Sequence, residues 1–90
     1  MNIVRSAVAG TLESSDAMVV VEPWSPGTKV EIESVVLEEY GDRIRQVVDG
    51  LLRELHVTGA RIQITDRGAL DCVISARLET ALHRAREVQS

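Results

Sequence analysis

The spacing of the hydrophobic residues changes along this chain, and this change limits most strongly what the chain can fold into. In the first 33 residues, hydrophobic side chains alternate with polar ones or form short runs, which is typical of β-strands. From about residue 35 they recur at intervals of three and four, which is typical of an amphipathic helix. Residues 61–65 alternate again before a second helical pattern begins. The sequence therefore predicts the element order β-β-β-α-β-α.

The first two strands are predicted to form a hairpin. Residues 8–12 alternate, and residues 18–21 form a short apolar, β-branched run. Between them, residues 13–16 read Glu-Ser-Ser-Asp, and Ser and Asp side chains readily hydrogen-bond their own backbone in turns. Because the connection is so short, we expect Ser14 and Ser15 to be exposed at the hairpin tip.

Two further strands are predicted on either side of the first helix. Residues 29–33 follow a break at residues 23–27, where prolines and a glycine prevent regular pairing. In this third strand, Val30 and Ile32 should face the core and the glutamates between them should face outward. Residues 61–65 alternate cleanly and predict a fourth strand.

Two amphipathic helices complete the predicted fold. The first runs from about residue 35 to 55 with Ser34 as its N-cap, and Gly41 inside the pattern favours a kink or a fresh start there. The second has an apolar stripe that begins at Leu70 and runs to about residue 87. Since each helix and each strand has one apolar side, we expect an α/β fold of the α+β type. Its small, mostly antiparallel sheet would be covered on one face by both helices.

Size and charge exclude several classes of function. Ninety residues predict a single domain, residues 1–90, with little room for a deep catalytic cleft. The net charge of -4, the absence of a basic stripe and the scarcity of aromatic residues argue against nucleic acid and anionic membranes as partners. No apolar run reaches the length of a membrane span, and residues 1–5 do not open a signal peptide, so we expect a cytoplasmic protein.

The cysteine, the histidines and two aspartates near the last helix are expected to have structural roles and not catalytic ones. Cys72, the single cysteine, is expected to be a buried and inert helix residue. His56 and His83 have no neighbouring ligand at metal-binding spacing, so no metal site is expected. Asp66 and Asp71 flank the glycine turn before the last helix and are expected to act as caps.

Charged residues are expected to lie mainly on solvated surfaces. One acidic set is interpreted as a solvated face that would steer docking onto basic partner subunits, and it consists of Glu31, Glu33, Glu38, Glu39 and Asp42. Three arginines of the last helix are expected to favour the negative end of its dipole, namely Arg77, Arg84 and Arg86. For Ser14 and Ser15, residue type alone favours turn formation.

A resemblance to a known family changes the interpretation of the two serines. The string AGTLESSDAM at residues 9–18 resembles the serine-bearing segment of the citrate lyase acyl carrier proteins, the gamma chains of that complex. The resemblance continues through GDRIRQVVDGLL and DRGALDCVISARLETAL. It implies that Ser14 carries a phosphodiester-linked 2'-(5''-triphosphoribosyl)-3'-dephospho-coenzyme A. The family usually has Glu-Ser-Gly-Asp, whereas this chain has Ser15 in place of glycine, and alignment on residues 10–13 favours Ser14.

The resemblance also implies a function. The chain would be a non-catalytic carrier whose arm moves acetyl and citryl thioesters between the alpha acyl carrier transferase subunit and the beta citryl lyase subunit. Citrate would thereby be cleaved to oxaloacetate and acetate, and a prosthetic-group transferase would load the serine. The nearest alternative is the acyl carrier subunit of malonate decarboxylase, which uses the same type of prosthetic group. An alternative of another class is an unmodified protein-interaction module.

Overall fold

The computed structural model describes residues 1–88 and contains a four-stranded sheet in the order β1-β2-β4-β3. The strands are β1 (Ala7–Gly10), β2 (Ala17–Pro23), β3 (Lys29–Ser34) and β4 (Ala60–Asp66). The β1–β2 and β2–β4 pairs are antiparallel, and the β3–β4 pair is parallel because α1 (Leu37–Glu54) returns the chain between them. The predicted element order and the mostly antiparallel sheet are confirmed. The parallel β3–β4 pair makes the sheet mixed and not purely antiparallel.

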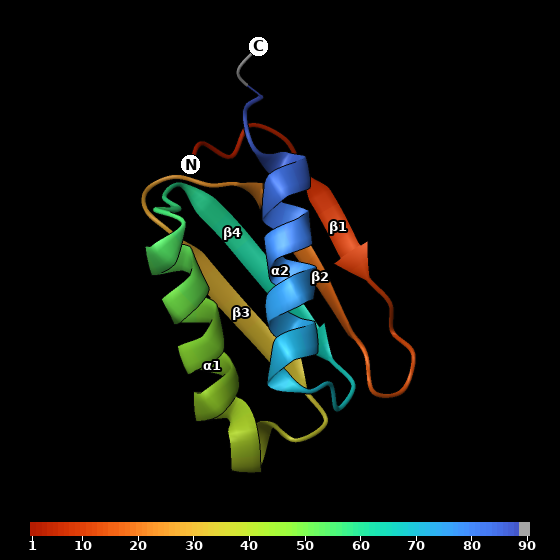
Figure 1. Cartoon of the computed structure of the whole chain (residues 1–90). Helices are drawn as coiled ribbons and strands as arrows, with labels where there is room; N and C mark the ends of the chain where they lie inside the picture. The colour runs from red at the N-terminus through yellow and green to blue at the C-terminus, as the bar shows by residue number, and fades with distance from the viewer. Residues whose placement is uncertain (89–90) are drawn as a thin grey trace.

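Both helices, α1 and α2 (Asp71–Ala85), cover the same face of the sheet (Figure 1). The alternation predicted for β4 is confirmed, because Ile62 and Ile64 point toward the helices and are buried. Aliphatic side chains from the strands and both helices fill the space between the layers, and the largest of them that are fully buried are Val19, Val21, Val48, Ile62, Ile64, Ile74, Leu78 and Leu82. The core is therefore aliphatic and lies between the sheet and the two helices.

The other face of the sheet carries a cluster of charged side chains that spans β2, β4 and β3. Arg61 donates hydrogen bonds to Glu22 at 2.8 Å and to Glu31 at 2.7 Å, and its guanidinium lies 5.6 Å from the Trp24 ring centroid. Its hydrogen bond, and less strongly its charge, lower the pKa of Glu31. Glu33 lies on the same side of β3. The predicted single acidic face is therefore wrong, because its other members lie on α1.

The predicted start of the first helix is also wrong. Ser34 ends β3, and its hydroxyl donates to an Asp66 carboxylate oxygen at 2.8 Å and accepts the Val36 N–H at 3.1 Å. Val36 is the N-cap residue of α1 and makes no side-chain capping bond. The helix then continues through Gly41 without interruption. The Ser34 hydroxyl thus joins two strand ends instead of capping the helix.

The packing of β4 predicts a clear difference between the two faces of the sheet. Ile64→Ala should lower the free energy of unfolding by about 2–5 kcal/mol, because a large buried side chain leaves a cavity in a dense core. Val8→Ala, on the open face and 48% exposed, should change it by less than about 0.5 kcal/mol. Urea denaturation of both variants measures the two values. Equal losses would contradict the assignment of the faces.

Candidate functional site

Three connections between elements meet at one end of the molecule. They are the β1–β2 connection at residues 11–16, the β3–α1 connection at residues 35–36 and the β4–α2 connection at residues 67–70. Figure 1 shows these connections at the bottom of the view and both chain termini at the top. We call residues 11–16 the serine loop and this end of the molecule the serine end.

The backbone of the serine loop is fixed against the β4–α2 connection. The Ser15 N–H donates to the Arg67 carbonyl at 2.9 Å, and the Arg67 N–H donates to the Asp16 carbonyl at 2.9 Å. Gly10 enters the loop with a φ of +88°, and a Cβ at this position would overlap the Ala17 carbonyl. The Gly10 position therefore requires glycine for both its φ angle and its close backbone contact.

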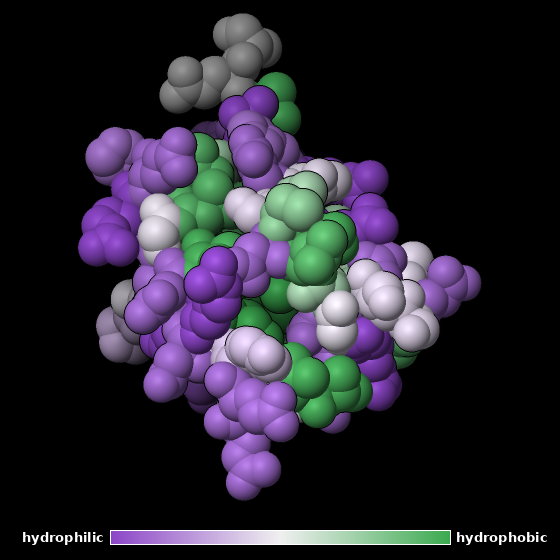
Figure 2. All heavy atoms as spheres, turned by 60° about the horizontal axis from the view of Figure 1, so that its bottom comes forward, coloured by the Kyte–Doolittle hydropathy of each residue, from purple (hydrophilic) through white to green (hydrophobic). Residues whose placement is uncertain are grey.

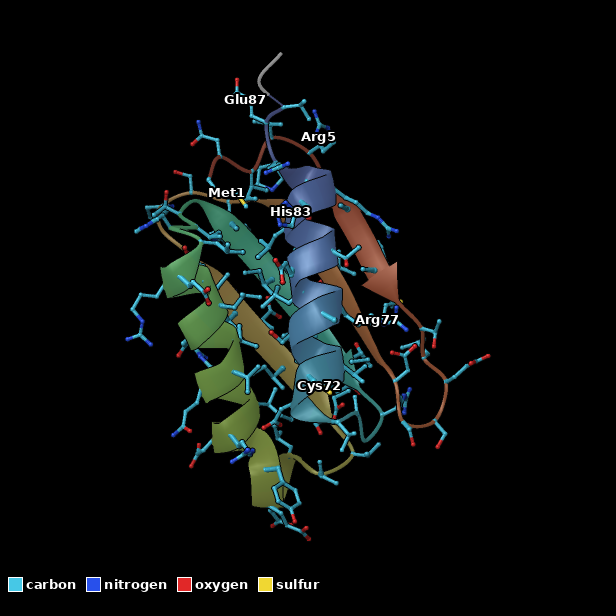
Figure 3. All side chains as sticks on the ribbon, in the orientation of Figure 1. Met1, Arg5, Cys72, Arg77, His83 and Glu87 are labelled. Carbon is cyan, nitrogen blue, oxygen red and sulfur yellow. The ribbon has the colours of Figure 1, made fainter. Side chains whose placement is uncertain are left out.

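The Asp16 carboxylate organises the loop from inside. It accepts hydrogen bonds from the Thr11 hydroxyl at 2.6 Å, the Ala17 N–H at 2.7 Å, and Nε and Nη2 of Arg77 at 3.0 and 3.1 Å. The Arg77 bonds are the main reason that the pKa of Asp16 lies far below its usual value, followed by those from Thr11 and Ala17. Figure 3 shows Arg77 extending from α2 toward this loop. The expected dipole role of Arg77 is thus replaced by a bidentate bond to the serine loop.

The two serines differ in their surroundings. Both are exposed, as predicted, but Ser15 has a φ of +65°, in the left-handed region that favours glycine, and its N–H is bonded to Arg67. Within residues 1–88, no protein hydrogen bond holds the hydroxyl of either serine. The loop thus has a fixed backbone and presents free hydroxyls, and the two serines differ in backbone conformation.

Cys72 lies at the same end but is exposed in the first turn of α2, so the prediction that it is buried is wrong. The predicted stripe of α2 placed Leu70 in the core, yet Leu70 is the N-cap residue and is 72% exposed. Both errors have one cause, since no other element among residues 1–88 covers the start of α2. Figure 3 places Cys72 at the serine end of that helix.

Asp66 has a role that the sequence analysis missed. It is 1% exposed, and its two carboxylate oxygens accept the Ser34 hydroxyl at 2.8 Å and the Ala69 N–H at 2.9 Å. It therefore joins β3 to the β4–α2 connection and does not cap α2. Asp71 is not a cap either, because its carboxylate forms a 2.6 Å ion pair with Arg43. The signal for Asp66 was its position in the inward register of β4.

The histidines lie away from the serine end. His56 follows the C-terminal end of α1, and His83 lies in the last turn of α2, 3.6 Å from Glu79. Among residues 1–88, no group of three or more His, Cys, Asp or Glu side chains is arranged to hold a metal ion. The same residues include no helix that is long and apolar enough to cross a membrane.

Comparison with known proteins identifies the family. Residues 4–85 match the family model of acyl carriers described as Malonate decarboxylase delta subunit (MdcD). The citrate lyase acyl carrier protein of Yersinia enterocolitica is 53% identical over 88 residues, which are 97% of this chain and 91% of that protein. The corresponding protein of Streptococcus uberis is 49% identical over 85 residues, which are 94% and 84% of the two chains. The chain belongs to the citrate lyase acyl carrier protein family. It is an acyl carrier protein, and membership implies a covalently attached prosthetic group.

A solved structure shares the fold of this carrier. One chain in the crystal structure of a Pseudomonas malonate decarboxylase hetero-tetramer in complex with malonate superposes with a TM-score of 0.82. It is 25% identical in sequence, and the match covers 91% of the carrier and 84% of that chain. That chain and this carrier therefore share the same arrangement of strands and helices.

The bonds of Asp16 predict an acid-sensitive contribution to stability. Because the pKa of Asp16 is lowered on folding, its contribution is complete above the unfolded-state pKa of about 3.9 and is lost as pH falls toward the folded-state pKa. The difference in unfolding free energy between wild type and Asp16→Asn should therefore shrink between about pH 5 and pH 3. Urea unfolding across this range measures it. Asp49→Asn, in an exposed pair with Arg45, is the control and should show little change. A constant Asp16 difference would contradict the assignment.

Proposed function

We propose that this chain is the non-catalytic acyl carrier subunit of a cytoplasmic citrate lyase complex and that Ser14 carries its prosthetic group. One observation carries the proposal: in a member of this carrier family, Ser14 presents a free hydroxyl on a loop whose backbone is fixed from both sides. A modifying enzyme needs access to the hydroxyl, and the attached arm needs a constant point of departure. The serine loop meets both requirements.

The surroundings of Ser14 fit a phosphate-containing arm. The arm would be a 2'-(5''-phosphoribosyl)-3'-dephospho-coenzyme A group. It would be joined to Ser14 Oγ by a phosphodiester when the donor, 2'-(5''-triphosphoribosyl)-3'-dephospho-coenzyme A, loses diphosphate and the serine loses its proton. Arg67 is exposed beside the loop and forms no salt bridge within residues 1–88, and Arg77 is held at the loop by Asp16. Guanidinium groups are well suited to phosphate oxygens. When bound, the arm supplies a terminal thiol that carries the acyl group as a thioester.

Two arguments favour Ser14 over Ser15. The family pattern has glycine at the position of Ser15, so a hydroxyl there is not part of the pattern. The left-handed backbone at Ser15 gives a physical reason for that glycine, because glycine adopts a φ of +65° without steric cost. Ser14 is then the hydroxyl that this chain has in common with the family pattern.

The role of the chain in the complex would be to present the arm. The alpha acyl carrier transferase subunit would exchange acetyl for citrate on the arm, and the beta citryl lyase subunit would release oxaloacetate and leave acetyl on it. A prosthetic-group transferase would load Ser14 beforehand. Tethering raises the local concentration of the thioester at both active sites, as it does for linked binding modules. Asp16 and Arg77 would keep the point of attachment in place throughout.

A second candidate is the carrier subunit of malonate decarboxylase. The matching family model is named for that enzyme, and the solved relative comes from a malonate decarboxylase hetero-tetramer. Sequence identity favours citrate lyase, with 53% for the Yersinia relative and 25% for the chain of the hetero-tetramer. Reconstitution of the loaded carrier with each set of subunits distinguishes the two candidates, and we expect activity with the citrate lyase set.

The assignment of Ser14 predicts distinct results for the two serines. Ser14→Ala should abolish loading by the prosthetic-group transferase, because it removes the oxygen that forms the phosphodiester. Ser15→Ala and Ser15→Gly should both be loaded, since they keep that oxygen. Co-expression followed by intact-mass measurement and peptide mapping locates the group. A group on Ser15, or on the Ser14→Ala variant, would refute the residue assignment, and a wild-type chain that is never loaded would refute the carrier proposal.

The loaded chain alone should not cleave citrate. A reaction of this kind needs a nucleophile paired with a base, or a metal, inside a site that excludes water. Around Ser14 the structure has an exposed loop, and His56 and His83 lie at the other end of the helices. Measurement of oxaloacetate formation by the purified loaded chain should give only background, and activity should return when the partner subunits are added. Turnover without partners would contradict a non-catalytic role.

A further inference from the structure

A groove opens at the serine end between the first turns of the two helices. It has a volume of about 560 Å³. Val36, Tyr40 and Ile44 line it from the α1 side, and Ala69, Leu70 and Cys72 line it from the start of α2. Volumes of about 300–1,000 Å³ are usual for small-molecule sites. The groove is therefore large enough for part of a small ligand.

The groove is mainly apolar and is not covered by any element among residues 1–88. Tyr40 is 53% exposed and Leu70 is 72% exposed, although Leu70 belongs to the predicted apolar stripe of its helix. Val35 and Leu37 are exposed beside it. Figure 2 turns this end toward the viewer and shows hydrophobic patches among hydrophilic side chains. These exposed side chains indicate a ligand with an apolar part.

The two carboxylates of the groove are already bonded within the protein. The Asp66 carboxylate accepts bonds from Ser34 and Ala69, and the carboxylate of Asp71 is paired with Arg43. Each carboxylate of the groove thus has a partner in the protein, which weakens its repulsion of an anionic ligand. The apolar walls, more than these groups, would supply the binding energy.

The groove is continuous with the serine loop. Gly68 lines the groove, and the residue before it, Arg67, exchanges backbone hydrogen bonds with Ser15 and Asp16. The exposed Arg67 thus belongs to the same connection that lines the groove and holds the serine loop. The surface offers a guanidinium group at this connection and apolar walls in the groove.

We propose that the groove holds the pantetheine and thioester end of the prosthetic arm while the carrier is between partner enzymes. This inference rests on the proposed function, because it needs the arm on Ser14. The arm has its anionic phosphates near the point of attachment and its dimethyl group and acyl thioester at the far end, the same order as the surface from Arg67 to the groove. Binding in the groove protects the thioester from water. A partner subunit must therefore displace the arm from the groove before it can react.

Cys72 provides a test that does not depend on activity. In loaded protein, shown by intact mass to carry the arm, the arm thiol and Cys72 are equilibrated with reduced and oxidised glutathione. Disulfide formation joins the two sulfurs, and the two hydrogens reduce oxidised glutathione to two thiols. The equilibrium gives the effective concentration of the arm at Cys72. The control is the double variant Cys72→Ser, Glu33→Cys, whose cysteine is exposed on β3 at the same end but on the open face of the sheet.

The proposal predicts an effective concentration at least about tenfold higher at Cys72 than at the control position, because the groove adds binding to simple tethering. Leu70→Ser should lower the value at Cys72 toward the control. Val4→Ser, an exposed apolar position near the other end, should leave it unchanged. Both substituted residues are exposed, so both variants should fold.

Three outcomes would overturn the proposal. Equal values at Cys72 and at the control position would show tethering without binding. A Leu70→Ser variant could also form the disulfide as readily as wild type and yet transfer acyl groups poorly in the complex. This result would show that the groove binds a partner subunit and not the arm. Neither of these two results would contradict the proposed function, because the carrier in both experiments bears the arm. A chain that never acquires the arm would overturn both.

Discussion

The pairing of β4 on both of its edges is the constraint on which the rest of the structure depends. On one side β4 pairs with β2 of the N-terminal hairpin, and on the other it pairs with β3. Its inward residues, Ile62 and Ile64, also lie at the centre of the core. Because β4 ends at Asp66 and Arg67 follows directly, this strand end places the carboxylate that joins the loops and the backbone that fixes the serine loop. Fold and candidate site thus depend on one strand.

The serine end combines a hydrogen-bonded support with the exposed hydroxyl of Ser14. Asp16 is bonded to the helix through Arg77 and to its own loop through Thr11, so the loop cannot move independently of α2. The Ser14 hydroxyl takes no part in these bonds. Under the proposed function, this end of the molecule would fix the place where the prosthetic arm begins. The bonds that hold the loop and the hydroxyl that would be modified thus belong to different residues.

The fold alone does not distinguish the two enzymes in which such carriers are named. At 25% identity, the chain of the malonate decarboxylase hetero-tetramer retains this fold with a TM-score of 0.82. Function belongs to sites and surfaces more than to the fold that supports them. The exposed residues around Ser14, including the groove at the starts of the helices, are therefore the surface where carriers of one complex would differ from those of another.

The sequence by itself determined the elements, the hairpin with exposed serines and the inward residues of β4, because these depend on periodicity and on short connections. It also pointed to Ser14, through resemblance and not through geometry. Only the tertiary structure decided the roles of Ser34, Asp66, Cys72 and Arg77. Each role depends on which groups surround the residue in the folded chain. Asp66 accepts a hydrogen bond from Ser34 on the paired strand, and Arg77 donates to Asp16 from α2. Cys72 is exposed to solvent. Local patterns contain no information about such neighbours, since the chain must first close its sheet around β4 to bring them together.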